Sequence, residues 1–338
     1  MRLSEGQSVV DIALSGQLIV PSAAATRAKA LDRLRLGDLV FRHLTRAAAF
    51  AVLLLLSGVI ISLIDGSIPA FKTFGFGFLV NERWNPVTEI FGALPAIYGT
   101  IITSFIAMLI AVPMGLLIAF FLTELCPQWL RRPIGIAIEL LAGIPSIIYG
   151  IWGLFIFAPF LQQTLQPFLI DTLGSVPLIS SLFAGPPYGI GILTSGLVLA
   201  IMVLPFITSI TRDVFGAVPA VLKEAAYGIG CTRWETMRNV VLPYARVGVI
   251  GGVMLGLGRA LGETMAVTFV IGNAHRISAS ILAPGTTISA TIANEFTEAV
   301  GDLYTSALIA LGLILFIITF IVLAIARYML LRIERQIG

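Results

Sequence analysis

Six long apolar runs constrain the fold of this chain more than any other feature of its sequence. Each is about as long as the roughly 20 residues that a helix needs to cross a bilayer, and only helices or closed barrels satisfy the backbone in lipid. The runs are continuous, which favours helices, and only 12% of all residues are charged. We therefore predict an all-α integral membrane protein with six transmembrane helices. Their approximate positions are 45–64, 96–122, 134–160, 190–210, 247–271 and 305–326.

The distribution of basic residues predicts the orientation of these spans. An even number of spans places both termini on the same side of the membrane. With the termini inside, three of the 21 lysines and arginines are external (Lys72, Arg83 and Arg276), one lies within a span (Arg259), and the remaining 17 are cytoplasmic. This excess inside is what the positive-inside rule requires. We expect a multi-pass protein of a bacterial inner membrane with both termini in the cytoplasm.

The polar, basic N-terminal segment admits two interpretations. The residues before position 26 imitate a secretory signal peptide, but Asp11 and Gln17 interrupt its apolar part. Cleavage would also leave basic residues outside, against the charge rule. We therefore favour an uncleaved cytoplasmic tail. The predicted boundaries are a tail at 1–44, a six-helix membrane domain at 45–331 and a cytoplasmic end at 332–338.

Three segments are expected on the outside. The first, 65–95, is rich in phenylalanine and carries Trp84, and we favour an interfacial aromatic belt there over a docking surface. The second, 161–189, has a single charge and several prolines, and we expect it to lie along the outer membrane face. The third, 272–304, is long for a simple connection, which indicates a functional loop.

Arg259 and Glu263 are two charges inside the fifth apolar run. Each charge at mid-bilayer costs roughly 2.5 to 3.5 kcal/mol, so such residues usually face a protein interior or a water-lined path. Their spacing of four places both on one face of a continuous helix, where they can pair. We favour a substrate pathway over a neutralised pair that only holds helices together. Gly256, Gly258 and Gly262 would let another helix approach this one closely.

The third run contains both a charge and a proline. Pro145 should kink its helix and free a carbonyl group. Glu139 lies near the cytoplasmic end, where it either snorkels back to the cytoplasm or meets a cation in the bundle. We regard Glu139, Pro145 and Ser146 as candidates for lining the pathway or supporting the kink.

The largest internal cytoplasmic segment, about 211–246, has the signals of two short helices. Pro219 suits a first helical turn, and Gly228 and Gly230 supply a stop. A capping box, Thr232-Arg233-Trp234-Glu235, then begins a second helix, and Pro243 marks its expected end. Such a pair either rests on the lipid surface or forms a knob that enters a groove of a partner.

This segment resembles the EAA loop of permease subunits in ABC importers. The matching positions, at the spacing of that family, are Glu224-Ala225-Ala226, Gly230, Val240 and Leu242-Pro243. The resemblance implies a type I ABC importer permease architecture. It also implies that the loop is the coupling element that seats in the ATPase. That role falls on Glu224, Ala225, Ala226 and Gly230.

Further segments resemble the permeases of phosphate-specific importers, of the PstC type rather than its PstA partner. They are Trp84-Asn85-Pro86 and the stretches 92–100, 141–150 and 259–264. The resemblance implies that Arg259 and Glu263 lie on a phosphate route through the membrane. It also implies four kinds of partner: a second permease of the PstA type, an ATPase dimer of the PstB type that uses ATP and Mg, an external phosphate-binding protein of the PstS type, and membrane lipid. We expect no nucleic acid partner.

Several chemistries are not expected of the chain itself. No glycine precedes any of its three lysines, so no phosphate-binding Walker loop is present and ATP must be used by a partner. The two histidines and two cysteines offer no metal constellation. We therefore predict a transport subunit that binds no cofactor and is not an enzyme. The alternatives are a sulfate or molybdate permease, an ion-gradient transporter, which would have two related halves, and a sensor scaffold that reports phosphate supply.

Overall fold

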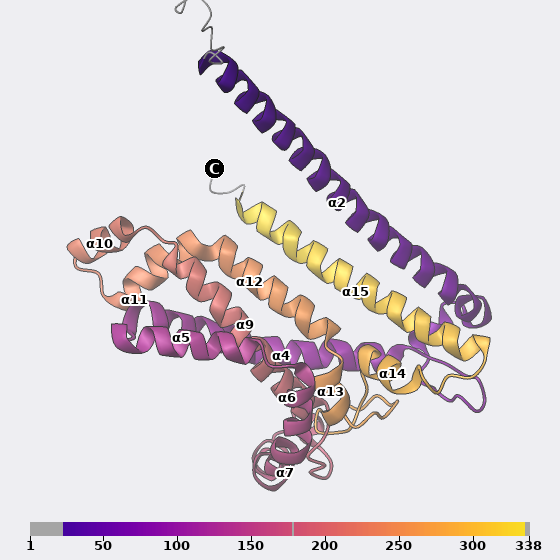
Figure 1. Ribbon diagram of the computed structural model, residues 1–338. Coiled ribbons are helices and arrows are strands. Elements are labelled where there is room, and N and C mark those ends of the chain that lie inside the picture. The colour runs from indigo at the N-terminus through magenta and orange to yellow at the C-terminus, as the bar shows by residue number, and fades with distance from the viewer. Residues whose placement is uncertain (1–22, 178, 335–338) are drawn as a thin grey trace, which may run out of the picture. The chain divides into compact units, whose positions relative to one another are not determined.

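The computed structural model describes residues 23–177 and 179–334 (Figure 1). The chain divides into two compact units, Met1–Ile61 and Ser62–Gly338. In the first unit, the described residues are all helical and form the beginning of α2 (Ala23–Phe74). The helix therefore extends into the expected tail, whose residues 1–22 lie outside the described part of the chain. The signal-peptide alternative falls mostly on those residues.

The second unit is built almost entirely from helices. After the end of α2, the helical elements are α3 (Gly77–Val80), α4 (Leu94–Phe120), η1 (Phe121–Leu125), α5 (Gln128–Ala142), α6 (Ser146–Trp152), η2 (Gly153–Phe157), α7 (Ala158–Phe160), η3 (Leu161–Leu165), α8 (Gln166–Leu173), η4 (Ser180–Phe183), α9 (Ile192–Gly216), α10 (Ala220–Gly228), α11 (Arg233–Thr236), η5 (Met237–Val241), α12 (Leu242–Gly262), α13 (Met265–Val270), α14 (Ile288–Glu295) and α15 (Asp302–Glu334).

Six helical stretches within the described residues are long and apolar enough to cross a membrane, which confirms the predicted number. Their bounds are Gly37–Phe74, Leu94–Leu125, Ser146–Leu173, Ile192–Gly216, Arg233–Gly262 and Asp302–Tyr328. The third differs from the prediction of 134–160, and it includes residues 161–173 that we had expected along the outer membrane face. The break at Pro145 moves the start of this span to residue 146, and the helix then continues without a break through η2, α7, η3 and α8 to Leu173.

Small residues let the central helices of the second unit pack closely. A Cβ at Gly196 of α9 would lie 2.6 Å from Ile106 of α4, so only glycine permits this contact. Gly256 of α12 is similarly close to Ile207 of α9, with 2.8 Å to its side chain. The predicted close approach is therefore confirmed at Gly256, whereas nothing lies within 4 Å of a Cβ at Gly262.

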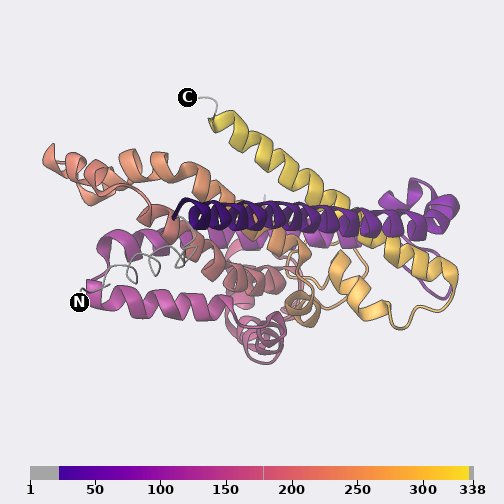
Figure 2. The same cartoon turned by 45° about the horizontal axis from the view of Figure 1, so that its top comes forward.

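The third apolar run is broken rather than kinked. α5 ends at Ala142, and Pro145 is the N-cap of α6 with an extended ψ of 137°. Proline has no N–H to donate to the carbonyl of Leu141, four residues before it. The hydroxyl of Tyr149 donates to that carbonyl instead, at 2.9 Å. The chain turns sharply at this point, so that α6 leaves the direction of α5 (Figures 1 and 2).

The third external segment folds back into the bundle. The amides of Ile192 and Leu193, at the start of α9, donate to carbonyls of residues 283 and 281 at 3.2 and 2.8 Å. Leu282 is 1% exposed. Irregular backbone is tolerated at such depth only where protein surrounds it or where it lines a cavity. Residues 280–291 are therefore an internal part of the fold, whereas Arg276, Phe296 and Val300 of the same segment are exposed.

The predicted aromatic belt is wrong for most of its members. Phe78 is fully buried, and its ring contacts Phe71 and Phe74 at centroid distances of 5.8 and 6.2 Å. Trp84 meets Phe91 edge to face at 5.0 Å. These rings form an internal cluster because the segment after α2 folds onto α4 and α15. Of the expected belt residues, only Phe76 is exposed, at 88%.

Candidate functional site

The predicted cytoplasmic helices protrude at one end of the second unit (Figure 1). Pro219 is the N-cap of α10, one position before the expected first turn. Gly230 lies in the connection between α10 and α11 and has a φ of +90°, a backbone conformation that residues with a side chain rarely adopt. The capping box is confirmed, because Glu235 Oε2 accepts the amide of Thr232 at 2.8 Å while Thr232 Oγ1 accepts the amide of Glu235 at 3.3 Å.

The second of these predicted helices does not end at Pro243. It continues through the π-helical turn η5 into α12, so that Arg233–Gly262 is one stretch of helix. Pro243 lies in the first turn of α12, directly after the π-helical turn η5. A proline is tolerated in the first turn of a helix. Residues 233–246 of this segment are therefore continuous with the helix of the fifth span.

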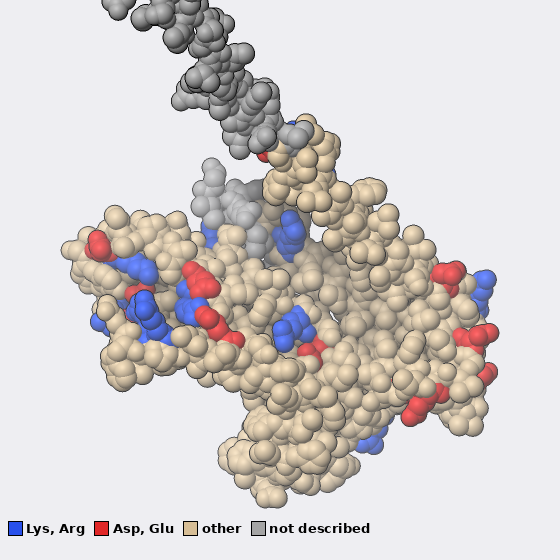
Figure 3. Space-filling model, viewed as in Figure 1, with Lys and Arg blue, Asp and Glu red and all other residues tan. Residues whose placement is uncertain are grey.

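The four residues that match the EAA pattern differ in their exposure to solvent. Glu224, Ala225 and Gly230 are exposed, whereas Ala226 is 5% exposed and packs inward. Charged side chains gather at the end of the second unit that carries α10 and α11, and others lie at its opposite end (Figure 3). The exposed face of α10 combines the charge of Glu224 with apolar side chains, since Val221 is 72% exposed and Ile229, directly after the helix, is 85% exposed.

Glu124 is bonded to both short helices, α10 and α11, and was not among the site residues predicted from the sequence. Its Oε1 lies 2.6 Å from Lys223 Nζ, and its Oε2 accepts the hydroxyl of Tyr227 at 3.4 Å. Its backbone carbonyl accepts Arg233 Nη1 at 3.2 Å. Burial and the neighbouring Glu124 carboxylate raise the pKa of Tyr227. One sequence signal marks Glu124: it is the first charged residue after Glu89, at the end of a long apolar run.

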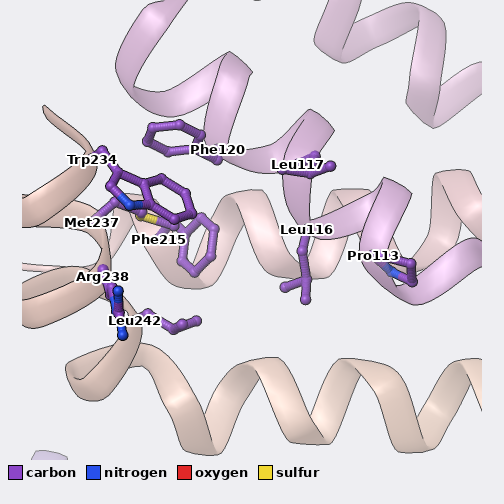
Figure 4. Close-up of a pocket in the computed structure, with 9 residues that line it drawn as sticks. All are labelled: Pro113, Leu116, Leu117, Phe120, Phe215, Trp234, Met237, Arg238 and Leu242. Carbon is purple, nitrogen blue, oxygen red and sulfur yellow. The ribbon is translucent and has the colours of Figure 1, made fainter.

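An apolar groove of about 310 Å³ lies beside these contacts, between the end of α4 and the base of the coupling loop (Figure 4). Phe120 and Trp234 face each other across its upper end, with ring centroids 6.1 Å apart. The full lining is Pro113, Leu116, Leu117, Phe120, Phe215, Trp234, Met237, Arg238 and Leu242.

Glu139 forms an ion pair with Arg212, and contact with a cation was one of the two arrangements predicted for it. Its Oε1 lies 2.7 Å from Arg212 Nη2 of α9, and Arg212 also pairs with Asp213 at 2.9 Å. The Glu139 side chain is 52% exposed, so this is a surface ion pair and not a buried one. Such pairs contribute only about 0.2 to 1 kcal/mol.

The predicted pairing of Arg259 with Glu263 is wrong. α12 ends at Gly262, and Glu263 is extended, with φ −68° and ψ 131°. Glu263 Oε1 accepts the amide of Ala266 at 3.2 Å, which satisfies a free N–H in the first turn of α13. Arg259 lies over the ring of Phe206, 5.9 Å from its centroid. Within the described residues, its guanidinium has no carboxylate oxygen within 4 Å.

Two broken helices meet in the middle of the second unit. α6, which follows the break at Pro145, packs against α13, which follows the break at Glu263. The packing is close, since a Cβ at Gly150 would lie 3.0 Å from the carbonyl oxygen of Met265. Broken helices leave backbone polar groups and helix ends inside a membrane protein, where they can contact a charged substrate.

A polar cluster on the predicted external side was also missed. Glu295 accepts hydrogen bonds from Trp84 Nε1 and the Tyr304 hydroxyl, both at 2.6 Å, and its other oxygen lies 2.7 Å from His275 Nε2. Burial alone would raise the pKa of Glu295, but these hydrogen bonds outweigh it and hold the pKa below its ordinary value. The cluster ties the first and third of the predicted external segments together. Elsewhere, the described residues hold no group of three His, Cys, Asp or Glu side chains suited to a metal ion.

Six helices that are long and apolar enough to cross a membrane, together with a protruding helical pair of the EAA pattern, define a permease-type component of a membrane transport system. Residues 111–335 match the family described as "Binding-protein-dependent transport system inner membrane component", and the chain belongs to this family. It is therefore a multi-pass inner membrane protein and a transport subunit, not an enzyme.

Relatives across nearly the whole chain confirm the resemblance to PstC-type permeases. The chain is 69% identical over 322 residues to the phosphate transport system permease protein PstC of Mesorhizobium japonicum, covering 95% of this chain and 98% of the relative. It is 60% identical over 301 residues to the protein of the same name from Pasteurella multocida, covering 89% of this chain and 94% of that one.

A solved structure shows the same fold at low sequence identity. It is a bacterial ABC transporter involved in the import of the acidic polysaccharide alginate. The identity is 16%, the match covers 90% of this chain and 99% of that chain, and the TM-score is 0.57. The likeness confirms the ABC importer permease architecture that the EAA loop implied.

Proposed function

We propose that this chain is a permease subunit of an ATP-driven phosphate importer, in which it forms half of the translocation pathway. The observation that carries the proposal is the 69% identity, over 95% of the chain, to a protein named as a phosphate transport system permease. The proposed partners are a second permease of the PstA type, an ATPase dimer of the PstB type and an external phosphate-binding protein of the PstS type. ATP and Mg are used by the ATPase, and both termini are cytoplasmic.

The geometry of the coupling loop supports the proposed transfer of energy from the ATPase. α10 exposes Glu224 and Ala225, while Ala226 on its other side is buried against the fold. A rigid helix with one exposed and one packed face suits a knob that enters a groove, the second interpretation of this loop. The continuous helix from Arg233 to Gly262 then leads from the ATPase side to the level of the helix breaks.

Arg259 is the proposed contact for phosphate. A guanidinium presents planar donors that suit a tetrahedral oxyanion, and charge-assisted hydrogen bonds are strong where water is scarce. The cation lies at the end of α12, next to the two helix breaks, and is exposed in the isolated chain. Glu263 caps α13 beside it, and its proposed role is to hold the break open at this level rather than to neutralise Arg259.

Two experiments test this function. The first is purification of the chain from its membrane with an affinity tag and identification of the co-purifying subunits, where we expect a second permease, an ATPase and a phosphate-binding protein. The second is ATP-dependent uptake of labelled phosphate by the reconstituted complex, with unlabelled sulfate and molybdate as competitors. Competition by sulfate or molybdate equal to that by phosphate would favour another oxyanion. Uptake that needed an ion gradient and not ATP would contradict the proposal.

A further inference from the structure

The second span and the coupling loop meet at one carboxylate. Glu124 lies in η1, which continues α4 beyond Phe120, and it is reached from two helices that are distant in sequence. Lys223 and Tyr227, one turn apart on α10, bind its carboxylate. Arg233, on α11, binds its backbone carbonyl. Both cytoplasmic helices are therefore tied to the same point of α4.

This contact is shielded from solvent, unlike the other Asp/Glu pairs with Lys or Arg in the described residues. The Glu124 side chain is 10% exposed and that of Lys223 is 18% exposed, whereas Glu139 and Asp213 are 52% and 67% exposed in their pairs with Arg212. Removing one partner of a shielded pair leaves the other charge without compensation, which is far more disruptive than losing a surface pair.

Lys223 and Glu224 are neighbours in sequence but serve different faces of α10. Successive residues of a helix point about 100° apart. Glu224 is exposed, on the face proposed for the ATPase, while Lys223 points back to Glu124. A displacement of α10 by the ATPase thus acts directly on the ion pair with α4.

α4 connects this point to the external segment. At its other end, the hydroxyl of Thr100 accepts the amide of Ile288 at 3.0 Å, and the hydroxyl of Tyr98 donates to the carbonyl of Ser278 at 3.0 Å. The same helix is therefore bonded to the coupling helices at one end and to the buried external segment at the other.

We propose that Glu124 is the positioning residue that transmits the movement of the coupling helices to α4, through its ion pair with Lys223. The inference rests on the proposed function for the presence of an ATPase, but not on the identity of the transported substrate. Glu124 does not bind the ATPase itself, because its contacts are with α10 and α11 on their inner side. Loss of Glu124 uncouples ATP hydrolysis from the conformation of the external segment while the ATPase stays bound.

The test uses the assembled complex in cells, with Ser278→Cys as an external reporter. A membrane-impermeant maleimide is added outside, and the labelling rate of Cys at position 278 is compared with and without ATP turnover trapped by vanadate. We expect trapping to change the rate several-fold in the parent. In Glu124→Gln the change is lost, the ATPase still co-purifies, and substrate uptake per ATP hydrolysed falls about tenfold. Asp213→Asn, which removes a carboxylate from an exposed pair, behaves as the parent.

A charge swap separates transmission from simple damage to the fold. Glu124→Lys combined with Lys223→Glu rebuilds the pair with reversed polarity, and we expect it to recover at least half of the vanadate response that each single change loses. If Glu124→Gln lowers the amount of assembled complex, the vanadate response of the double variant still tests the role of the ion pair.

Three outcomes would overturn the role of Glu124: a full vanadate response in Glu124→Gln, loss of the ATPase from that variant, or a swap that recovers nothing. A parent complex that responds to vanadate but carries no phosphate would instead overturn the proposed function and leave the role of Glu124 in place.

Discussion

The guanidinium of Arg259 lies over the ring of Phe206 on the neighbouring helix α9, 5.9 Å from its centroid. A cation above an aromatic face is attracted by the ring without using its N–H donors. Glu263, the expected partner, is instead turned toward the first turn of α13. Arg259 is therefore held in place by a contact that keeps its hydrogen-bonding edge available for an anion.

Arg259→Gln tests this role directly. Glutamine retains polar atoms but lacks the charge and the planar set of donors, so we expect phosphate uptake to fall by about 10- to 100-fold, the loss of a charge-assisted contact. Assembly with the second permease and the ATPase should survive, because Arg259 makes no ion pair within the described residues. Uptake is measured with labelled phosphate. Arg238→Gln, which removes an exposed arginine from the same continuous helix, is the matched control, and normal uptake by Arg259→Gln would contradict the proposed contact.

Glu224→Lys tests the docking face of α10. Glu224 is exposed and makes no ion pair within the described part of the chain, so its replacement should leave the fold intact while reversing the charge that the ATPase meets. We expect the ATPase to be lost from a pull-down with the tagged chain. Asn239→Lys introduces a lysine at another exposed position of the same segment and should retain the ATPase. Retention in both variants would argue against docking at Glu224.

The sequence predicts the fold where the signals are local. The apolar runs identify six spans, and the capping box at Thr232 and the stop at Gly230 appear as expected, because each depends on residues within a few positions. The disruption at Pro145 was predicted at the right residue, but as a kink, whereas the chain breaks there and the freed carbonyl of Leu141 is satisfied by Tyr149 on the next helix. The break at Glu263 was not predicted, because no proline marks it. Glu124 was missed because its partner Lys223 is 99 residues away.

Gly99→Ala tests the packing of the external segment into the bundle. A Cβ at Gly99 would clash with the carbonyl group of Thr286, whose oxygen and carbon are backbone atoms that cannot rotate away. We expect a loss of several kcal/mol, seen as a lower Tm and a lower yield of folded protein. Gly251→Ala on α12 is the control, because nothing lies within 4 Å of its Cβ. There alanine should be neutral or stabilise by up to about 1 kcal/mol. Equal behaviour of the two variants would show that the segment is not packed against α4.

The carboxylate cluster at Glu295 predicts a dependence of stability on pH. Burial opposes the charge, but the hydrogen bonds from His275, Tyr304 and Trp84 together lower the pKa of Glu295 below its ordinary value of 4.5. A group whose pKa is lower in the folded state contributes stability that is present above the pKa of the unfolded state and is lost as the pH falls through the folded value. We therefore expect the Tm of the purified protein to decrease as the pH is lowered below about 4.5, and protonation of Glu295 contributes to this decrease.

Glu295→Gln isolates that contribution. At pH 7 the variant should lose about 1 to 3 kcal/mol, because glutamine cannot accept all three hydrogen bonds with the strength of a carboxylate. Its Tm should also depend less on pH below 4.5 than that of the parent, since position 295 no longer titrates. Glu298→Gln, an exposed carboxylate in the same segment, should match the parent in both respects. An identical pH profile for Glu295→Gln and the parent would mean that the cluster does not stabilise the charged form, and that Trp84 and Tyr304 are held by ring packing alone.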